Sequence, residues 1–384
     1  MYFDKNIVHF SAGNGGGVQT IIDNIIKYST ARNLKYRIIY TLRIEDRSTW
    51  YVDIKNLKAH ESIFKYSKFE NTYYVFKRLA KCLINEEEII VAHDWLELGM
   101  ASSLGIKNPL LFYLHADTKY YYDLAILHNN VIDAYVCYSR VIENKLKKNK
   151  ILLHHKIYYQ IYPVPQIAFL RLPSKELRII YCVKSLLEER KNFKLIPDIA
   201  KYTSSLNILW TIVGLGYTRK VLIDLLGTDK VIYYPKLEND ELIGLMQKQD
   251  IFILPSHSEG LPVSLIEAMK CQNVPLITSW NGAETDLIIN NQTGFVLPNL
   301  VYPFANVIND LYTNRNKLES IGLNAMEKAN SFCNPYISVS NLETILLTTQ
   351  IKITVPPLLK VYSSRLDGKW IPNSFTKIVR KYFI

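Results

Sequence analysis

The sequence has few of the features that would place the chain outside the cell or across a bilayer. Its five cysteines are far apart, and no CxxC or Cys/His spacing occurs, which predicts reduced core thiols. No apolar run reaches the ~20 residues needed to cross a bilayer. Asp4, Lys5 and His9 interrupt the apolar N-terminal stretch, which is therefore a poor signal peptide. These absences predict a cytoplasmic protein.

Length and composition indicate an ordinary globular protein. A chain of 384 residues is long for one hydrophobic core, which favours two domains. The contents of 48% hydrophobic and 21% charged residues exclude a disordered or fibrous protein. The net charge of +11 fits nucleic acid, an anionic membrane surface or a phosphorylated ligand as a partner. Composition alone does not choose among the three.

Short apolar runs of β type alternate with helical patterns along the chain, which is typical of parallel sheets covered by helices. The proline-containing stretch Tyr162–Glu176 is the predicted linker between two such series. We therefore expect an α/β fold with two Rossmann-like, doubly wound domains that face each other across a cleft. Their predicted bounds are residues 1–165 and 175–345, and a crossover segment, residues 346–384, returns a C-terminal helix to the first domain. The predicted strands are Asn6–Phe10, Tyr36–Tyr40, Ile89–Ala92, Leu110–Leu114, Ala134–Tyr138, Arg178–Val183, Asn207–Val213, Val231–Tyr234, Ile251–Leu254, Val274–Ile277 and Gly294–Val296.

Glycines follow two of these strands, where ligands of such sheets bind. The run Gly13–Gly17 precedes a predicted helix, Gln19–Tyr28, and its N–H groups would approach a ligand closely; a plain surface turn is the alternative. Its spacing is not that of the dinucleotide fingerprint GxGxxG. Gly214 and Gly216, after another strand, would either admit a nucleotide or only close the turn.

Cations follow the strand Arg178–Val183. Lys184 ends it, and Lys191 comes after a turn with Arg190 beside it. Two cations that flank one strand end can clamp a diphosphate and neutralise charge on a phosphate leaving group. A pair of ordinary surface lysines is the alternative.

The most informative segment follows the strand Ile251–Leu254. Glu259 lies in a predicted loop, Pro255–Pro262, and Glu267 lies within a predicted helix, Val263–Lys270. Pro262 suits the first helical position, and the free N–H groups that follow it favour an anion or sugar hydroxyls. Two carboxylates at this separation can hold hydroxyls at the two ends of a nucleotide-sugar. An outward-facing Glu267 is the alternative.

This segment resembles the signature of the family 4 retaining glycosyltransferases (glycosyl transferases group 1), which have the B-type fold, GT-B. That signature has two glutamates separated by seven residues, then Ala-Met, a proline before a strand, and a glycine-rich segment that ends in Thr-Gly. Here it reads Glu259-Gly-Leu-Pro-Val-Ser-Leu-Ile-Glu267-Ala268-Met269, then Val274-Pro275, Gly282 and Thr293-Gly294. Supporting similarities cover the whole chain: the first glycine run, His115 after a strand, Ser139, Lys184 with Lys191, Gly214 with Gly216, and Pro255-Ser256.

The resemblance implies a role for each matched residue. Glu259 would contact the transferred sugar, and Glu267 would hold the ribose hydroxyls. Lys184 and Lys191 would bind the diphosphate, and His115 would lie beside the reacting sugar. The other residues implied in donor binding are Gly16, Gly17, Arg190, Gly214, Gly216, Gly260, Leu261, Pro262 and Val263.

The sequence departs from the family pattern at a few positions. Lys184 stands where the family usually has arginine, so the bidentate fork is lost. The spacing from Lys184 to Lys191 is one residue longer than in the family pattern. Arg190 could therefore take the diphosphate-binding role in place of Lys191. Ala283 replaces a second glycine, and Asp286 replaces a glutamate.

The resemblance therefore implies a retaining glycosyltransferase, here a hexosyltransferase, that takes a sugar from a nucleoside-diphosphate donor such as a UDP-sugar. The acceptor would be a hydroxyl of a glycan or lipid-linked glycan in surface polysaccharide biosynthesis. No Asp-x-Asp motif occurs, which predicts no metal requirement and no other cofactor.

Two other interpretations remain. One is a sugar-nucleotide epimerase or phosphorylase with the same fold. The other is a non-catalytic nucleotide- or nucleic-acid-binding protein. The sequence has no recognition-helix, RNP or OB signature, so we expect no nucleic-acid partner.

Basic residues gather in two places, and the second is mixed with aromatic and aliphatic residues. The first group follows Ser139, and the second lies in the C-terminal tail. This mixture suits a helix on an anionic membrane, so a peripheral location on the inner face of the cell membrane is one expectation. Solvated lysines and a helix packed on the first domain are the alternative. The two groups are Lys145, Lys147, Lys148 and Lys150, and Arg365, Lys369, Lys377, Arg380 and Lys381.

Overall fold

The chain divides into two compact units in a computed structural model. Unit 1 comprises Met1–Tyr138, Ile142–Gln160 and Tyr336–Ile384, and unit 2 comprises Ser139–Val141 and Ile161–Pro335. The structure describes residues 4–13, 16–49, 52–150, 156–167, 174–280, 282–350, 352, 356–359 and 364–383. Within the expected linker and the first glycine run, residues 168–173, Asn14 and Gly15 therefore lie outside the described residues.

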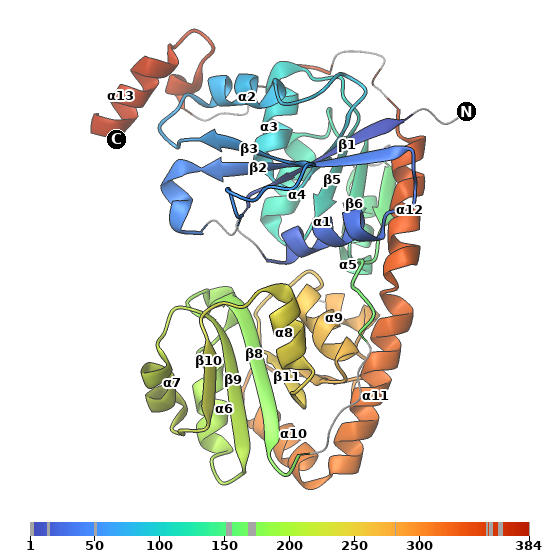
Figure 1. The fold of residues 1–384 in the computed structure, drawn as a ribbon, viewed down its shortest axis with the longest axis vertical. Coiled ribbons are helices and arrows are strands. Elements are labelled where there is room, and N and C mark those ends of the chain that lie inside the picture. The colour runs from blue at the N-terminus through green and yellow to red at the C-terminus, as the bar shows by residue number, and fades with distance from the viewer. Residues whose placement is uncertain are drawn as a thin grey trace. The chain divides into compact units, whose positions relative to one another are not determined.

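Unit 1 contains a seven-stranded parallel sheet with the strand order β3-β2-β1-β4-β5-β6-β7 (Figure 1). Its strands are β1 (Lys5–Ser11), β2 (Leu34–Arg43), β3 (Glu61–Tyr66), β4 (Ile89–Ala92), β5 (Leu110–Leu114), β6 (Ala134–Cys137) and β7 (Lys156–Tyr159). Its helices are α1 (Gly17–Tyr28), α2 (Thr72–Ala80), α3 (Trp95–Leu104), α4 (Lys119–Leu127) and α5 (Arg140–Lys148), with α12 (Pro335–Thr348) and α13 (Asn373–Phe383) from the C-terminal part.

Unit 2 contains a six-stranded parallel sheet with the order β10-β9-β8-β11-β12-β13. Its strands are β8 (Leu177–Ser185), β9 (Ile208–Leu215), β10 (Val231–Tyr234), β11 (Ile251–Leu254), β12 (Val274–Thr278) and β13 (Phe295–Leu297). Its helices are α6 (Leu195–Tyr202), α7 (Arg219–Leu226), α8 (Asn239–Met246), α9 (Val263–Lys270), α10 (Val301–Thr313) and α11 (Arg315–Phe332).

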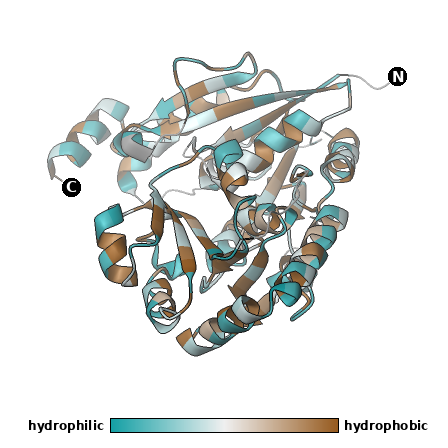
Figure 2. Ribbon diagram, turned by 60° about the horizontal axis from the view of Figure 1, so that its bottom comes forward, coloured by the Kyte–Doolittle hydropathy of each residue, from teal (hydrophilic) through white to brown (hydrophobic). Residues whose placement is uncertain are grey.

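The central strands are buried on both faces. Every residue of β4, β5, β6 and β11 is buried, which explains why these strands read as continuous apolar runs rather than alternating ones. In Figure 2 the strands carry much of the hydrophobic colour, whereas the covering helices are mixed. The predicted class, two Rossmann-like parallel sheets covered by helices, is confirmed.

The sequence patterns did not predict the two edge strands of unit 1. In β3 only Phe64 is buried, and Glu61, Ser62 and Lys65 leave just two adjacent aliphatic or aromatic residues, Ile63 and Phe64, so no continuous apolar run marks the strand. No residue of β7, at the other edge, is fully buried. Helix α9 has its predicted bounds, but Pro262 is the residue before the first helical position, because its ψ of 127° is extended.

The C-terminal part belongs to unit 1 from Tyr336 onward, ten residues before the predicted crossover segment of residues 346–384 begins. Glu343 of α12 accepts hydrogen bonds from the Ser29 hydroxyl (2.6 Å) and from the backbone N–H groups of Thr30 (2.9 Å) and Ala31 (3.0 Å). The Lys5 ammonium group donates to the carbonyls of Leu347 and Thr349, both at 2.7 Å, where a cation meets the negative end of the helix. Among the described residues, no helix is both long enough and apolar enough to cross a membrane.

Candidate active site

Each sheet has one place where the strand order reverses, and open α/β sheets bind ligands there, beyond the carboxyl ends of the strands. In unit 2 this place lies between β8 and β11, and in unit 1 between β1 and β4. Lys184 lies near the end of β8, Arg190 and Lys191 follow it, and Glu259 follows β11. The topology therefore brings these segments together, although 68 residues separate Lys191 from Glu259.

Glu259 is the centre of the polar cluster in unit 2. Its side chain is 7% exposed, and both carboxylate oxygens accept charge-assisted hydrogen bonds. Lys191 Nζ lies 2.6 Å from Oε1, and Arg190 Nη1 lies 2.8 Å from Oε2. The sequence left Arg190 and Lys191 as alternatives for one role. In the structure both bind the same carboxylate. Such contacts are about twice as strong as neutral ones and hold both cations in place.

A short turn and a loop position these side chains. The 3-10 turn Glu189–Lys191 ends at Asn192, which has a positive φ of 52°, a conformation that asparagine tolerates. The Tyr181 hydroxyl donates to the Lys191 carbonyl (3.0 Å), and the Asn192 amide donates to the Pro255 carbonyl (3.2 Å). The His257 N–H donates to the Arg190 carbonyl (2.8 Å). The cations therefore approach Glu259 from a fixed backbone.

A second carboxylate, that of Glu188, also pairs with Arg190, at 2.7 Å. Burial alone would lower the pKa of Arg190, but the carboxylates of Glu259 and Glu188 together raise it. The Arg190 side chain is 37% exposed, so one side of this cation faces solvent. Lys184, the remaining predicted cation, lies near the end of β8 and is exposed. Partial burial lowers the pKa of its ammonium group, and Glu188 opposes that shift.

Glu267 lies on α9 with its side chain buried, so it does not face solvent. Its Oε1 atom has no hydrogen-bond partner among the described residues. Burial raises the pKa of this carboxyl group to about 7, against the opposing effects of Asn239 and Lys270. A buried carboxylate oxygen without a donor is costly, and a ligand hydroxyl would supply that donor.

The loop into α9 presents backbone groups. Gly260 and Leu261 are buried, and no side chain caps the helix at Pro262. The N–H groups of Val263 and its successors begin the helix, where an anion or a hydroxyl oxygen is favoured. The position of these four predicted residues is thus compatible with ligand contact.

The predicted glycines differ in whether the surrounding structure leaves room for a side chain. Gly214 has a φ of 149°, and a Cβ atom there would lie 2.6 Å from the Val183 carbonyl oxygen. Gly216 would bring a Cβ atom within 2.8 Å of Leu187. Close packing of the turn is sufficient reason for both. A Cβ atom at Gly16 meets nothing within 4 Å, and Gly16 precedes Gly17, the first residue of α1, with no side-chain cap.

His115, the predicted site residue of unit 1, belongs to a row of three imidazoles. His9 lies near the end of β1, and His93 and His115 directly follow β4 and β5, which are neighbouring strands. His9 Nδ1 lies 3.1 Å from His93 Nε2, and His93 Nδ1 lies 2.8 Å from His115 Nε2. His9 Nε2 and His115 Nδ1, the two ends of the row, are buried without a partner in the described part of the chain.

This imidazole row is neutral. Burial lowers the pKa of His9 and of His115 to about 3, and it lowers that of His93 well below the usual value. The rings stack on aromatic neighbours, for example His115 on Tyr138 with ring centroids 5.7 Å apart. His9 and His93 were not among the residues predicted from the sequence. What could have identified them is their position: both lie at the ends of the strands that flank the switch point of the sheet.

Among the described residues, no group of three or more His, Cys, Asp and Glu side chains is placed to hold one metal ion. The three imidazoles bind one another in a line rather than pointing at a common centre.

Comparisons with known proteins agree with this architecture. Residues 167–328 match the family described as glycosyl transferases group 1. An uncharacterized glycosyltransferase of Methanocaldococcus jannaschii is 23% identical over 342 residues, which cover 83% of this chain and 90% of that protein. Among solved structures, sucrose-phosphate synthase from Thermosynechococcus elongatus has a TM-score of 0.70 at 14% identity and covers 89% of this chain and 98% of its own. Anabaena HepE in complex with UDP and glucose has a TM-score of 0.68 at 15% identity and covers 89% of this chain and 99% of its own. The chain thus has the GT-B fold and is an enzyme of the glycosyltransferase class.

Proposed function

We propose that this enzyme is a retaining hexosyltransferase of family 4 that uses a nucleoside-diphosphate-sugar donor. The acceptor would be a hydroxyl of a glycan or lipid-linked glycan, in surface polysaccharide biosynthesis at the cytoplasmic side of the membrane. UDP is the nucleotide that we favour, because the structure of the similar protein HepE holds UDP and glucose.

One observation carries the proposal. The carboxylate of Glu259 is shared by Arg190 and Lys191 at the switch point of unit 2, and Glu267, whose Oε1 atom has no hydrogen-bond partner among the described residues, lies on the next helix. The cations suit a diphosphate, and the free carboxylate oxygen suits ribose hydroxyls. Lys184, from the end of β8, would add a further contact to the diphosphate. Gly214 and Gly216, after β9, would lie beside the nucleotide, and Gly16 and Gly17 would approach the donor or acceptor.

In the proposed reaction, the bond between the anomeric carbon and the diphosphate oxygen breaks with its electron pair on the diphosphate. The acceptor hydroxyl forms the new bond on the same face, and its proton goes to the departing diphosphate. The reaction therefore retains the anomeric configuration and needs no second carboxylate as a base. The protein contributes positioning and charge stabilisation.

Arg190 and Lys191 would neutralise the charge that develops on the leaving diphosphate. Glu259 would hold both cations extended before the donor binds, so that little reorganisation is needed, and would contact the transferred sugar. His115, neutral and with a free ring nitrogen, would accept or donate one hydrogen bond at the sugar.

We further propose that the reaction needs no divalent metal. The cations of the Glu259 cluster would supply the charge that a metal supplies elsewhere. If EDTA abolishes turnover by the purified protein and Mg²⁺ or Mn²⁺ restores it, this part of the proposal is wrong.

The direct test is a thermal-shift screen of nucleotide-sugars, followed by turnover with the best donor and by NMR of the product. A ligand that binds only the native state raises the melting temperature. We expect one donor to stabilise the protein and the product to keep the configuration of the donor. An inverted product would contradict retention. Epimerised donor in the absence of an acceptor would favour the epimerase interpretation, and sugar release that requires inorganic phosphate would favour the phosphorylase.

A further inference from the structure

The C-terminal segment of residues 364–383 is fixed to unit 1 by polar contacts. Asp367 is buried, accepts a hydrogen bond from the Thr72 N–H (2.6 Å) and pairs with Arg380 (2.8 Å). The Asn373 side chain accepts a hydrogen bond from the Asn71 N–H (2.8 Å). These contacts hold α13 beside the start of α2 (Figure 1).

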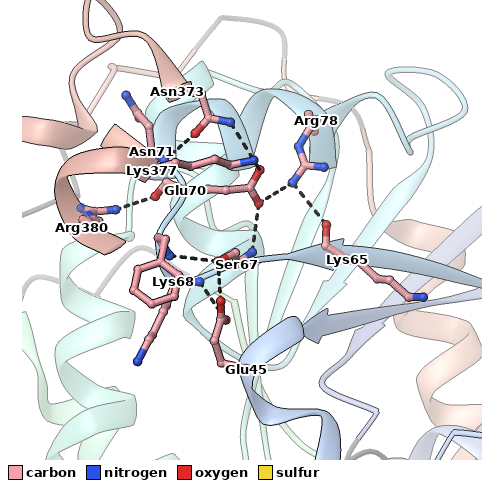
Figure 3. A network of polar contacts seen from close by, with 11 residues as sticks. Glu45, Lys65, Ser67, Lys68, Glu70, Asn71, Arg78, Asn373, Lys377 and Arg380 are labelled. Atoms are coloured by element: carbon pink, nitrogen blue, oxygen red, sulfur yellow. Dashed lines mark hydrogen bonds and ion pairs between the residues drawn. The ribbon is translucent and has the colours of Figure 1, made fainter. Parts of the chain in front are cut away.

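Glu70, just before α2, is the centre of this docking contact (Figure 3). Its side chain is 7% exposed and lies 3.1 Å from Lys377 Nζ and 2.9 Å from Arg78 Nη2. Arg380 donates to the Glu70 backbone carbonyl, and the Asn373 amide donates to its carboxylate (3.3 Å). A buried carboxylate with these partners gives α13 a defined orientation rather than a loose one.

The orientation of α13 is the reverse of the usual one. A surface helix normally buries its apolar face and exposes its polar face. In α13 the docked side consists of Asn373, Thr376, Lys377 and Arg380, and Thr376 is the one buried residue. The opposite side carries apolar residues at positions that share one helix face. Exposed on that face are Phe375 (53%), Ile378 (55%) and Tyr382 (68%). Trp370, just before the helix, and Phe383, its last residue, are exposed as well, at 83% and 79%.

The charge around this face has one sign. Residues 364–383 include five basic residues and a single acid, Asp367, which is buried and paired with Arg380. Lys369 Nζ lies 4.8 Å from the ring centroid of Trp370, and Lys381 Nζ lies 5.3 Å from that of Tyr382. The exposed aromatic face is therefore bordered by ammonium groups with no exposed carboxylate in the segment.

The other basic group of the chain has a different environment. On α5, Lys145 pairs with Asp117 (2.6 Å) and Lys147 pairs with Glu143 (2.7 Å). Two of the four lysines of that group are thus paired, as Lys377 and Arg380 of the tail are, but no large apolar residue of α5 is exposed. The tail thus combines an uncovered apolar face with positive charge, and anionic lipid headgroups over a hydrocarbon layer match both properties.

We propose that the exposed face of α13, together with Trp370, binds the surface of an anionic membrane. In this arrangement Phe375, Ile378 and Tyr382 enter the headgroup layer, and Lys369 and Lys381 contact lipid phosphates. The polar docking contacts on Glu70 and Asp367 fix unit 1 to the membrane at one orientation. This inference is independent of which sugar the enzyme transfers.

The test is co-sedimentation of the full chain with vesicles of phosphatidylcholine, with and without phosphatidylglycerol, at low and high salt. We expect binding to the anionic vesicles that high salt weakens. The triple variant Trp370→Ser/Phe375→Ser/Tyr382→Ser should lose about tenfold or more in partitioning, because it removes large interfacial side chains. A matched control, Leu300→Ser/Tyr302→Ser/Leu323→Ser, removes three exposed apolar residues of unit 2 and should bind as the wild type does.

Several outcomes would overturn the proposal: no binding by the wild type, equal binding to neutral and anionic vesicles, or an unchanged triple variant. If light scattering instead finds a dimer that the triple variant abolishes, and vesicles are not bound, the face is a contact between copies of the chain. Unchanged melting temperature and donor affinity of the triple variant separate this test from the proposed catalytic function. A second measurement is quenching of Trp370 fluorescence by brominated lipids, which should vanish in Trp370→Phe.

Discussion

Both units have buried polar residues at the switch point of the sheet, but these residues are stabilised in different ways in the two units. In unit 2 the buried carboxylate of Glu259 is matched by two cations, Arg190 and Lys191. In unit 1 the three imidazoles of His9, His93 and His115 stay neutral and bind one another. Burying a charge is tolerable when it is paired, whereas a histidine can lose its proton instead.

This difference fits a division of chemical tasks. A charged cluster can exchange partners with an anionic ligand, because the cations that hold a carboxylate can also hold a phosphate. A neutral row offers single hydrogen bonds that do not depend on charge. We therefore expect substitutions in the Glu259 cluster to affect turnover and donor binding strongly. We expect the protonation state of the folded imidazole row not to change between about pH 8 and pH 5.

The largest effect is expected from Glu259→Gln, which keeps the shape but removes the charge that holds both cations. Turnover should fall by about 10²–10³-fold, as when one charge-stabilising contact is removed from an active site. Glu188→Gln is the matched control, because Glu188 also pairs with Arg190 at 2.7 Å but is more exposed. Steady-state kinetics with a saturating donor measures both. Equal losses would mean that Glu259 has no special role.

A smaller effect is expected from Lys191→Met, which removes one cation. Loss of a charge-assisted hydrogen bond to the diphosphate should weaken donor binding by about 10–100-fold. Lys194→Met, three residues further and exposed, should bind the donor as the wild type does. Calorimetric titration with the nucleotide-sugar compares the two. If both variants bind equally well, Lys191 does not contact the donor.

Next comes the pH dependence of donor binding through Glu267. Since burial raises its pKa to about 7, the ionised form that accepts ribose hydroxyls is lost as the pH falls below 7. Donor affinity should fall by up to about tenfold per pH unit below that value and level off above it. Glu267→Gln should bind more weakly at high pH and show a flat profile. A pH-dependent profile in this variant would place the titrating group elsewhere.

The smallest effect is expected for the imidazole row. Because the pKa values of His9 and His115 lie at about 3, their ring signals in NMR should not shift between about pH 8 and pH 5. The unfolded chain takes up protons near pH 6.5 that the folded row does not, so the free energy of unfolding should fall as the pH drops below 6.5. Ring signals that titrate near pH 6.5 would show that the row is not buried and neutral.

Much of the fold could be predicted from the sequence because strands that are buried on both faces are continuous apolar runs. The bounds of β4, β5 and β11 agree with those predicted, since each is a short, fully buried apolar run. The bounds of β10, at the edge of unit 2, agree as well, because Val231–Tyr234 is also an uninterrupted run of β-branched and aromatic residues. The two edge strands of unit 1, β3 and β7, give no such signal. In β3 the apolar pair Ile63 and Phe64 is flanked by Ser62 and Lys65, and only Phe64 is buried, so the run is too short to mark a strand.

The candidate site was only partly predictable. The spacing of Glu259 and Glu267 marked the segment, but the shared contact of Arg190 and Lys191 depends on the direction that the chain takes at Asn192. The imidazole row depends on the strand order β1-β4-β5, which is not the order of the chain. Residues 84 positions apart, His9 and His93, become neighbours only in the folded sheet.

The central claim is that the Glu259 cluster of unit 2 is the donor site, and hydrogen exchange with UDP and, separately, GDP tests it most directly. We predict that one nucleotide slows exchange in peptides that cover residues 186–194 and 256–269. Lys191→Met should reduce this protection at the same nucleotide concentration, and Lys194→Met should not. Protection confined to other segments, or binding without protection at either segment, would contradict the account.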